Sequence, residues 1–152
     1  MDAERFQMEK EVIAQYMHNP NSYQFVNAAT PYLRIVAQTN GGRPYVLRIE
    51  CPDYPNTKPN AYVECMLKDH NGSLMNSASA TNHTLSPHSN NWTQICHYHP
   101  NAWKPNMSLW MIYVRCVIWL NIYEKTLQSK KTMDYYLSHM SENYSREEYL
   151  RH

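Results

Sequence analysis

The chain has 152 residues, of which 43% are hydrophobic and 18% charged, and this composition suits one compact domain. Its net charge of +1 gives no basic excess of the kind that nucleic-acid-binding proteins usually carry, so nucleic acid is not an expected partner. No segment approaches the ~20 apolar residues of a membrane span, and the charged opening MDAERFQMEK does not resemble a signal peptide. We therefore expect a cytoplasmic protein whose four cysteines, without a CxxC pair, stay reduced.

The first expected element is an amphipathic helix over residues 2–17. Phe6 and Ile13 fall on one helical face, and charged residues fill the other. Asp2 is the expected N-cap. Glu9 belongs to the charged set, so its side chain is expected in solvent.

Four strands are then expected as an antiparallel meander, over residues 23–28, 31–38, 45–51 and 61–67. Apolar and polar residues alternate along the last three, which indicates a sheet with one buried face. The NGG at residues 40–42 is a hairpin signal, because Gly and Asn tolerate positive φ angles. In the fourth strand the residues expected to point inward are Val63, Cys65 and Leu67.

The second half begins with residues 68–94, which are rich in Ser, Asn, His and Thr and predict a long irregular loop. A long helix is expected over residues 109–125, capped by Asn106 or Ser108 and apolar on more than one side. One or two short helices should follow in residues 132–152, of which 145–152 form a frayed tail, with inward-facing Met133, Tyr136, Leu137 and Met140. The predicted fold class is α+β, a single domain over residues 1–152 in which helices cover one sheet.

Three short motifs stand at junctions between these elements. They are YPNTKPN at residues 54–60, IC at 95–96 and WKP at 103–105. In this order they resemble the landmarks of the ubiquitin-conjugating (UBC-like) enzymes: a Tyr-Pro-x-x-Pro-Pro turn, a catalytic Ile-Cys segment and a Trp-x-Pro. The resemblance implies a UBC-like fold with an N-terminal helix, a four-stranded meander, an active-site loop, a long crossover helix and C-terminal helices.

The chain departs from that family in its active-site loop. The family has His-Pro-Asn ahead of the cysteine, whereas this chain has SPH at residues 86–88, and the loop before it is longer. Asn60 also replaces the second proline of the turn. Divergence of this kind resembles the bacterial conjugating-enzyme relatives of anti-phage operons, including the short forms of CBASS systems.

Cys96 is the predicted catalytic residue. The resemblance implies that its thiol carries, as a thioester, the carboxyl terminus of a ubiquitin-like modifier or of a cyclic-oligonucleotide synthase, and passes it to an amine. His88 stands where the family has its oxyanion-stabilising Asn, and Asn90 or Asn91 is the substitute if His88 does not serve.

Two histidines flank Cys96, and three further cysteines occur elsewhere in the chain. His97 and His99 flank the thiol, and imidazolium character nearby would lower its pKa. A zinc site could be drawn from a cluster of one cysteine and four histidines, namely His83, His88, Cys96, His97 and His99. The cluster lacks paired ligand spacing, so no metal or other cofactor is expected. The cysteines assigned to the core are Cys51, Cys65 and Cys116.

Partner contacts are expected at three places. Tyr54 and Pro55 border a partner surface in the family, and Trp92 is a candidate interface anchor. Arg5 and Lys10 lie where family members dock an activating enzyme.

Adenylation of the carboxyl group by ATP would occur on another polypeptide, because this chain has no Gly-rich phosphate loop. The alternatives are a catalytically inactive UBC-like adaptor and, ranked third, a Cys-His hydrolase.

Overall fold

The computed structural model describes residues 1–97 and 102–138, and its fold is α+β. Three expectations lie outside the described residues: those for His99, for Met140 and for the tail 145–152. Helix α1 (Ala3–Tyr16) and a 3-10 turn η1 (Pro20–Ser22) precede the sheet, and α2 (Leu109–Ser129) and α3 (Met133–Ser138) follow it. The strands are β1 (Tyr23–Val26), β2 (Tyr32–Gln38), β3 (Pro44–Glu50), β4 (Asn60–Val63), β5 (Thr84–Leu85) and β6 (Gln94–Ile95).

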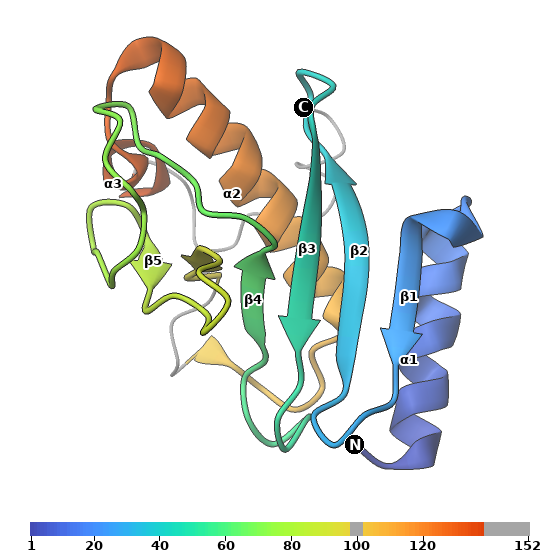
Figure 1. The fold of residues 1–152 in the computed structure, drawn as a ribbon. Helices are drawn as coiled ribbons and strands as arrows, with labels where there is room; N and C mark the ends of the chain where they lie inside the picture. The colour runs from blue at the N-terminus through green and yellow to red at the C-terminus, as the bar shows by residue number, and fades with distance from the viewer. Residues whose placement is uncertain (98–101, 139–152) are drawn as a thin grey trace.

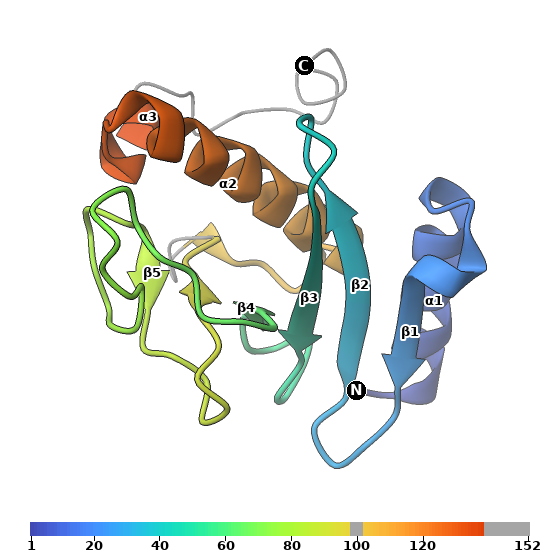
Figure 2. The same cartoon turned by 45° about the horizontal axis from the view of Figure 1, so that its top comes forward.

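The sheet is antiparallel throughout, in the order β1-β2-β3-β4-β6-β5. Helix α2 crosses one face of its central strands, and α1 lies along the β1 edge (Figures 1 and 2). The register pairs Leu33 with Ile49 and Ile35 with Leu47, and all four side chains are buried. The predicted alternation and the hairpin at residues 40–42 are therefore confirmed.

Residues 68–94 are not one irregular loop, because the sheet continues beyond four strands into β5 and β6. Polar side chains build the interior here. The Oγ1 of Thr93 accepts a hydrogen bond from the Leu67 amide at 3.0 Å and donates one to the Met75 carbonyl at 3.1 Å. Thr93 is fully buried. The hydrophobic pattern missed β5 and β6 because each strand has only two residues, one of which is a buried polar residue, Thr84 in β5 and Gln94 in β6.

The fourth strand is shorter than predicted. It ends at Val63, and the chain bends at Glu64, whose carboxylate pairs with Arg34 and Arg48 on the outer face of the sheet. Cys65 is exposed, so its assignment to the core is wrong. Cys51 and Cys116 are buried, as expected, and burial raises the pKa of both thiols to about 12.

Helix α2 has the predicted cap and the predicted breadth of burial. The Ser108 hydroxyl accepts a hydrogen bond from the Met111 amide, and Lys130 ends the helix with a left-handed φ of 60°. Its buried residues occur around most of its circumference, so the sheet and other segments cover it on several sides.

No helix in residues 1–97 and 102–138 has both the length and the apolar character that crossing a bilayer requires.

The carboxylate of Glu9 is fully buried, which overturns the expectation that it faces solvent. Its Oε1 accepts hydrogen bonds from the Tyr54 hydroxyl at 2.7 Å and from Arg5 Nε at 2.9 Å. Its Oε2 accepts one from the Leu109 amide, at the N-terminus of α2. A buried carboxylate is tolerated when it is paired and hydrogen-bonded, and a helix N-terminus favours negative charge. Glu9 thus joins α1, the residue 54–60 turn and α2.

We expect the substitution Glu9→Ala to lower the free energy of unfolding by about 3 kcal/mol, because it leaves buried donors unpaired. Glu11→Ala is the matched control. Glu11 lies on the exposed side of the same helix, where it bonds only Gln7 among the described contacts, so its loss should change stability by less than about 0.5 kcal/mol. Urea unfolding of both variants tests this, and equal effects would contradict the role given to Glu9.

Candidate active site

Cys96 directly follows β6, which lies between β4 and β5 in the sheet. Its side chain is half-buried. The segment is fixed on three sides: the Cys96 amide donates to the His83 carbonyl at 3.0 Å, the His97 ring bonds the Pro59 carbonyl at 2.7 Å, and Arg115 Nε donates to the His97 carbonyl at 3.0 Å. A thiol is therefore presented from a segment that is tied to a neighbouring hairpin, to a turn and to α2.

The three sequence motifs meet at the residue 54–60 turn. The Trp103 indole Nε1 donates to the Pro55 carbonyl at 3.0 Å, and the Trp103 and Tyr54 rings lie 5.9 Å apart. At the other end of the turn, the Pro59 carbonyl receives the hydrogen bond from His97. The turn therefore contacts both the cysteine-bearing segment and the residues that lead into α2.

His97 is a structural residue and not a source of positive charge. Its side chain is 7% exposed, and burial lowers its pKa to about 3, with smaller contributions from the neighbouring charges of Lys58 and Arg115. Its ring is neutral at physiological pH. The prediction that imidazolium character at His97 activates the thiol is therefore wrong.

His88 closes the tip of the β5–β6 hairpin. Its Nδ1 accepts the Asn90 amide at 3.0 Å, and its Nε2 lies 3.3 Å from the Glu50 carboxylate. The acceptor role of Nδ1 places the proton on Nε2, where it is donated to Glu50. The ring also stacks on Trp92 at 4.7 Å between centroids and meets Tyr62 edge-on at 4.8 Å. These contacts use both ring nitrogens and pack two aromatic rings against the imidazole.

The hairpin separates the predicted oxyanion residues from the thiol. His88 pairs with Trp92, which precedes Cys96 by four residues, and at about 3.3 Å per residue that is about 13 Å along the ladder. Asn90 and Asn91 are exposed in the turn itself, with Asn91 at a φ of 63°. The structure therefore does not bring His88, Asn90 or Asn91 to Cys96. Sequence spacing alone did not reveal where the chain reverses.

The predicted partner residues divide into buried and accessible ones. Tyr54 is 2% exposed, and Arg5 bonds Glu9, Tyr54 and the carbonyls of Pro105 and Met107, so both are engaged inside the molecule. Pro55 is half-buried beneath the Trp103 hydrogen bond.

Lys10 and Trp92 are the more accessible partner residues. Lys10 is exposed, with its ammonium over the Phe6 ring at 4.5 Å. Trp92 is half-buried on the outer sheet face, and the Arg48 guanidinium lies between its ring and that of Tyr32. Partner binding at these residues stays a prediction.

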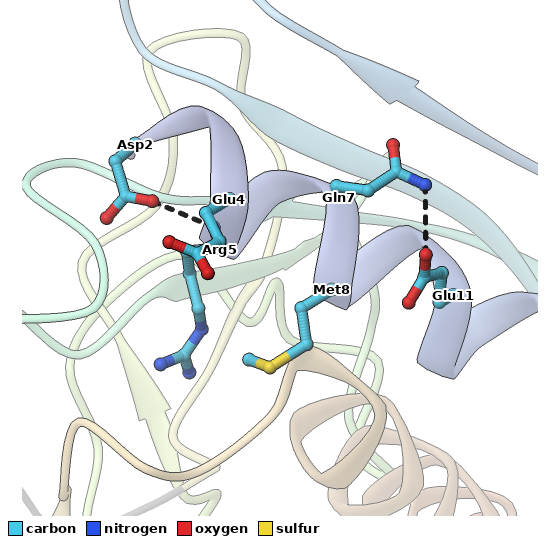
Figure 3. Close-up of a pocket in the computed structure, with 6 residues that line it drawn as sticks. All are labelled: Asp2, Glu4, Arg5, Gln7, Met8 and Glu11. Carbon is cyan, nitrogen blue, oxygen red and sulfur yellow. Dashed lines mark hydrogen bonds between the residues drawn. The ribbon is translucent and has the colours of Figure 1, made fainter.

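A hollow of about 600 Å³ lies on the outer side of α1. Figure 3 shows its lining, in which acidic side chains outnumber the one basic side chain: Asp2, Glu4, Arg5, Gln7, Met8 and Glu11. Asp2 accepts the Arg5 amide as the helix cap, which confirms the predicted N-cap. The accessible surface near the helix start is thus more acidic than its two basic residues suggested.

The histidines and Cys96 do not form a metal-binding group in the part of the chain that the structure describes. No three His, Cys, Asp or Glu side chains converge there. His83 bonds Asp134, His88 bonds Glu50, and His97 is turned to Pro59. Each of these histidines is thus held by its own partner.

The buried His97 predicts an acid-sensitive fold. The unfolded chain binds a proton at this histidine below about pH 6.5, whereas the folded chain does so only near pH 3. Stability from this source is fully present above pH 6.5 and falls by up to about 1.4 kcal/mol per pH unit as the pH drops toward 3. Urea unfolding at pH 7.5 and 4.5 should show a smaller loss in His97→Gln than in the wild type. An unchanged loss in His97→Gln, or an equal reduction in the control His18→Gln, would refute this assignment.

Comparisons with protein-family models, with curated proteins and with solved structures found no match to this chain. What the structure establishes is an α+β fold with an N-terminal helix, a six-stranded antiparallel sheet, a long helix and a short one.

Proposed function

We propose that the chain is a UBC-like acyl carrier. Cys96 forms a thioester with the carboxyl terminus of a ubiquitin-like modifier or of a CBASS cyclic-oligonucleotide synthase, and the acyl group passes to an amine. Its setting is the cytoplasm of a bacterium, in anti-phage defence. The bacterial setting and the role in anti-phage defence rest on the resemblance of the three motifs to those of the UBC-like enzymes.

One observation carries the proposal: the motif turn contacts both of the other motifs. Pro59 accepts from the residue after Cys96, and Pro55 accepts from Trp103. Motifs separated by some forty residues of sequence therefore form one connected structure around a partly exposed thiol. A carrier needs such a thiol on a fixed segment, because a bulky acyl donor must reach it.

The chemistry requires an activated carboxyl group from elsewhere. The thiolate of Cys96 attacks the acyl carbon of an acyl adenylate or a donor thioester, and AMP or the donor thiolate leaves with its bonding electrons. An acceptor amine then attacks the new thioester, the Cys96 thiolate departs, and the amine gives up a proton as the amide forms. The only glycines, Gly41, Gly42 and Gly72, form no phosphate-binding loop, so ATP is used by an activating partner.

An adaptor without catalysis is the alternative. It is favoured by the position of His88, whose ring is bonded to Glu50 and to the Asn90 amide at the hairpin tip and is not brought to Cys96. Such an adaptor would use the outer sheet face, where Trp92 and Tyr32 flank Arg48. Retention of a half-exposed cysteine at the junction of the motifs favours the carrier.

Co-expression with the genomic neighbours tests the carrier. We expect a larger species on non-reducing gels that disappears with reductant and is absent in Cys96→Ala. Cys96→Ser should instead form a larger species that survives reductant, because its acyl bond is an oxygen ester. The matched control is Cys65→Ser, which removes the exposed cysteine outside the site and should leave the wild-type pattern unchanged.

Mass spectrometry of the larger species identifies the modifier. Loss of the species in Cys65→Ser, or no species at all from a functional operon, would reject Cys96 as the carrier and support the adaptor. A species that persists in Cys96→Ala would likewise reject it.

A further inference from the structure

His83 occupies a position that no motif indicated. Thr84 pairs with Ile95 across the β5–β6 hairpin, which places His83 opposite Cys96. The Cys96 amide donates to the His83 carbonyl at 3.0 Å. This single backbone hydrogen bond holds the two residues next to each other just beyond the ends of β5 and β6. His83, rather than His88, is therefore the histidine that the hairpin sets beside the thiol-bearing residue.

The backbone of His83 is fixed from two sides. Its carbonyl accepts a second hydrogen bond, from the Trp119 indole of α2 at 3.1 Å, in addition to the one from Cys96. Its φ of 51° lies in the left-handed region, which non-glycine residues adopt only when their surroundings hold them there. The position of this residue relative to Cys96 is thus enforced by the sheet and by α2.

The ring of His83 is oriented by Asp134 of α3. Its Nε2 lies 2.9 Å from the Asp134 carboxylate, and the Asp134 amide donates to the Thr81 carbonyl at 2.9 Å. A carboxylate on one ring nitrogen holds the proton there and leaves the other nitrogen, Nδ1, as the basic one. The His83 side chain is 30% exposed, in contrast to buried His97, so it is open to proton exchange with solvent.

We propose that His83 is the general base for Cys96 and that Asp134 is the residue that positions it. The inference rests on the proposed function, because it names the group that prepares the carrier thiol. The Cys96 S–H bond breaks, its proton forms a bond to His83 Nδ1, and the electron pair stays on sulfur. The thiolate then attacks the activated acyl carbon, and His83 returns its proton to solvent.

The test measures the thiolate without needing a modifier. The full chain is reacted with iodoacetamide from pH 5.5 to 9.5, and the rates of the individual cysteines are read by peptide mass spectrometry. Exposed Cys65 is the internal reference. At pH 7 we expect wild-type Cys96 to react about ten times faster than Cys65, because a neighbouring base increases the thiolate fraction of Cys96.

His83→Gln should remove that advantage at pH 7, and Asp134→Asn should remove part of it. Both should approach the wild-type rate near pH 9.5, where hydroxide replaces the histidine as the acceptor of the thiol proton. The matched control His18→Gln changes an exposed histidine beyond the end of α1 and should leave the profile of Cys96 unchanged. Convergence at high pH distinguishes a base from a residue that only supports the local structure.

Three results would overturn the role of His83: a His83→Gln profile equal to the wild type, a rate loss that persists at pH 9.5, or an equal loss at Cys65. If His83→Gln does not fold, Asp134→Asn carries the test alone, because the Asp134 side chain is 57% exposed. The outcome is independent of the carrier experiment. If the Cys96 thiolate depends on His83 but no thioester species forms, His83 is supported as the base and the acyl carrier is rejected. If a thioester forms but His83→Gln leaves the pH profile of Cys96 unchanged, the acyl carrier is supported and the role of His83 is rejected.

Discussion

The buried carboxylate of Glu9 is the constraint on which the arrangement of this protein depends. It accepts hydrogen bonds from α1, from Tyr54 in the motif turn and from the first amide of α2. A buried charge of this kind is tolerable only when all of its partners are present, so it fixes three elements relative to one another. Arg5 extends the same network to the carbonyls of Pro105 and Met107 before α2. Motif residues that appeared suited to an outside partner are thereby committed to the interior.

From that fixed turn the structure leads directly to the thiol. Pro59 bonds the ring of His97, and Arg115 of α2 bonds the carbonyl of the same residue. Burial keeps the His97 ring neutral, and a neutral ring can be buried at low free-energy cost when its nitrogen is hydrogen-bonded. The buried, hydrogen-bonded ring thus gives the segment a rigid support. Cys96 is thus held from one side by elements tied to Glu9. Its other side is set by the β5–β6 hairpin and His83.

The two histidines of this hairpin illustrate how similar residues acquire different roles. His88 has both ring nitrogens hydrogen-bonded and two aromatic rings packed against it, so it serves to close the turn. His83 has one nitrogen on Asp134, and its ring is reached by solvent. The proposed carrier role depends on the reactivity of Cys96, and His83 is the residue that we propose alters that reactivity.

Local sequence patterns predicted those helices and strands that are specified by residues close together in the chain. The hydrophobic period, the Asp2 and Ser108 caps and the glycine hairpin gave α1, β2, β3 and α2 nearly at their observed bounds. The same patterns failed for Glu9 and Thr93, since polar side chains enter a core only when distant partners satisfy them. They also failed for Cys65, which the bend after Val63 turns outward.

For the candidate site, the sequence by itself determined which residue types are available and which cysteine stands between the motifs. Tertiary structure decided which histidine stands beside that cysteine. The register of β5 on β6 is fixed by the turn at residues 88–92 and by the bonds of Thr93 to the distant segments that contain Leu67 and Met75. A spacing of eight residues between His88 and Cys96 contains no information on where the chain reverses, and that reversal places His83 there instead.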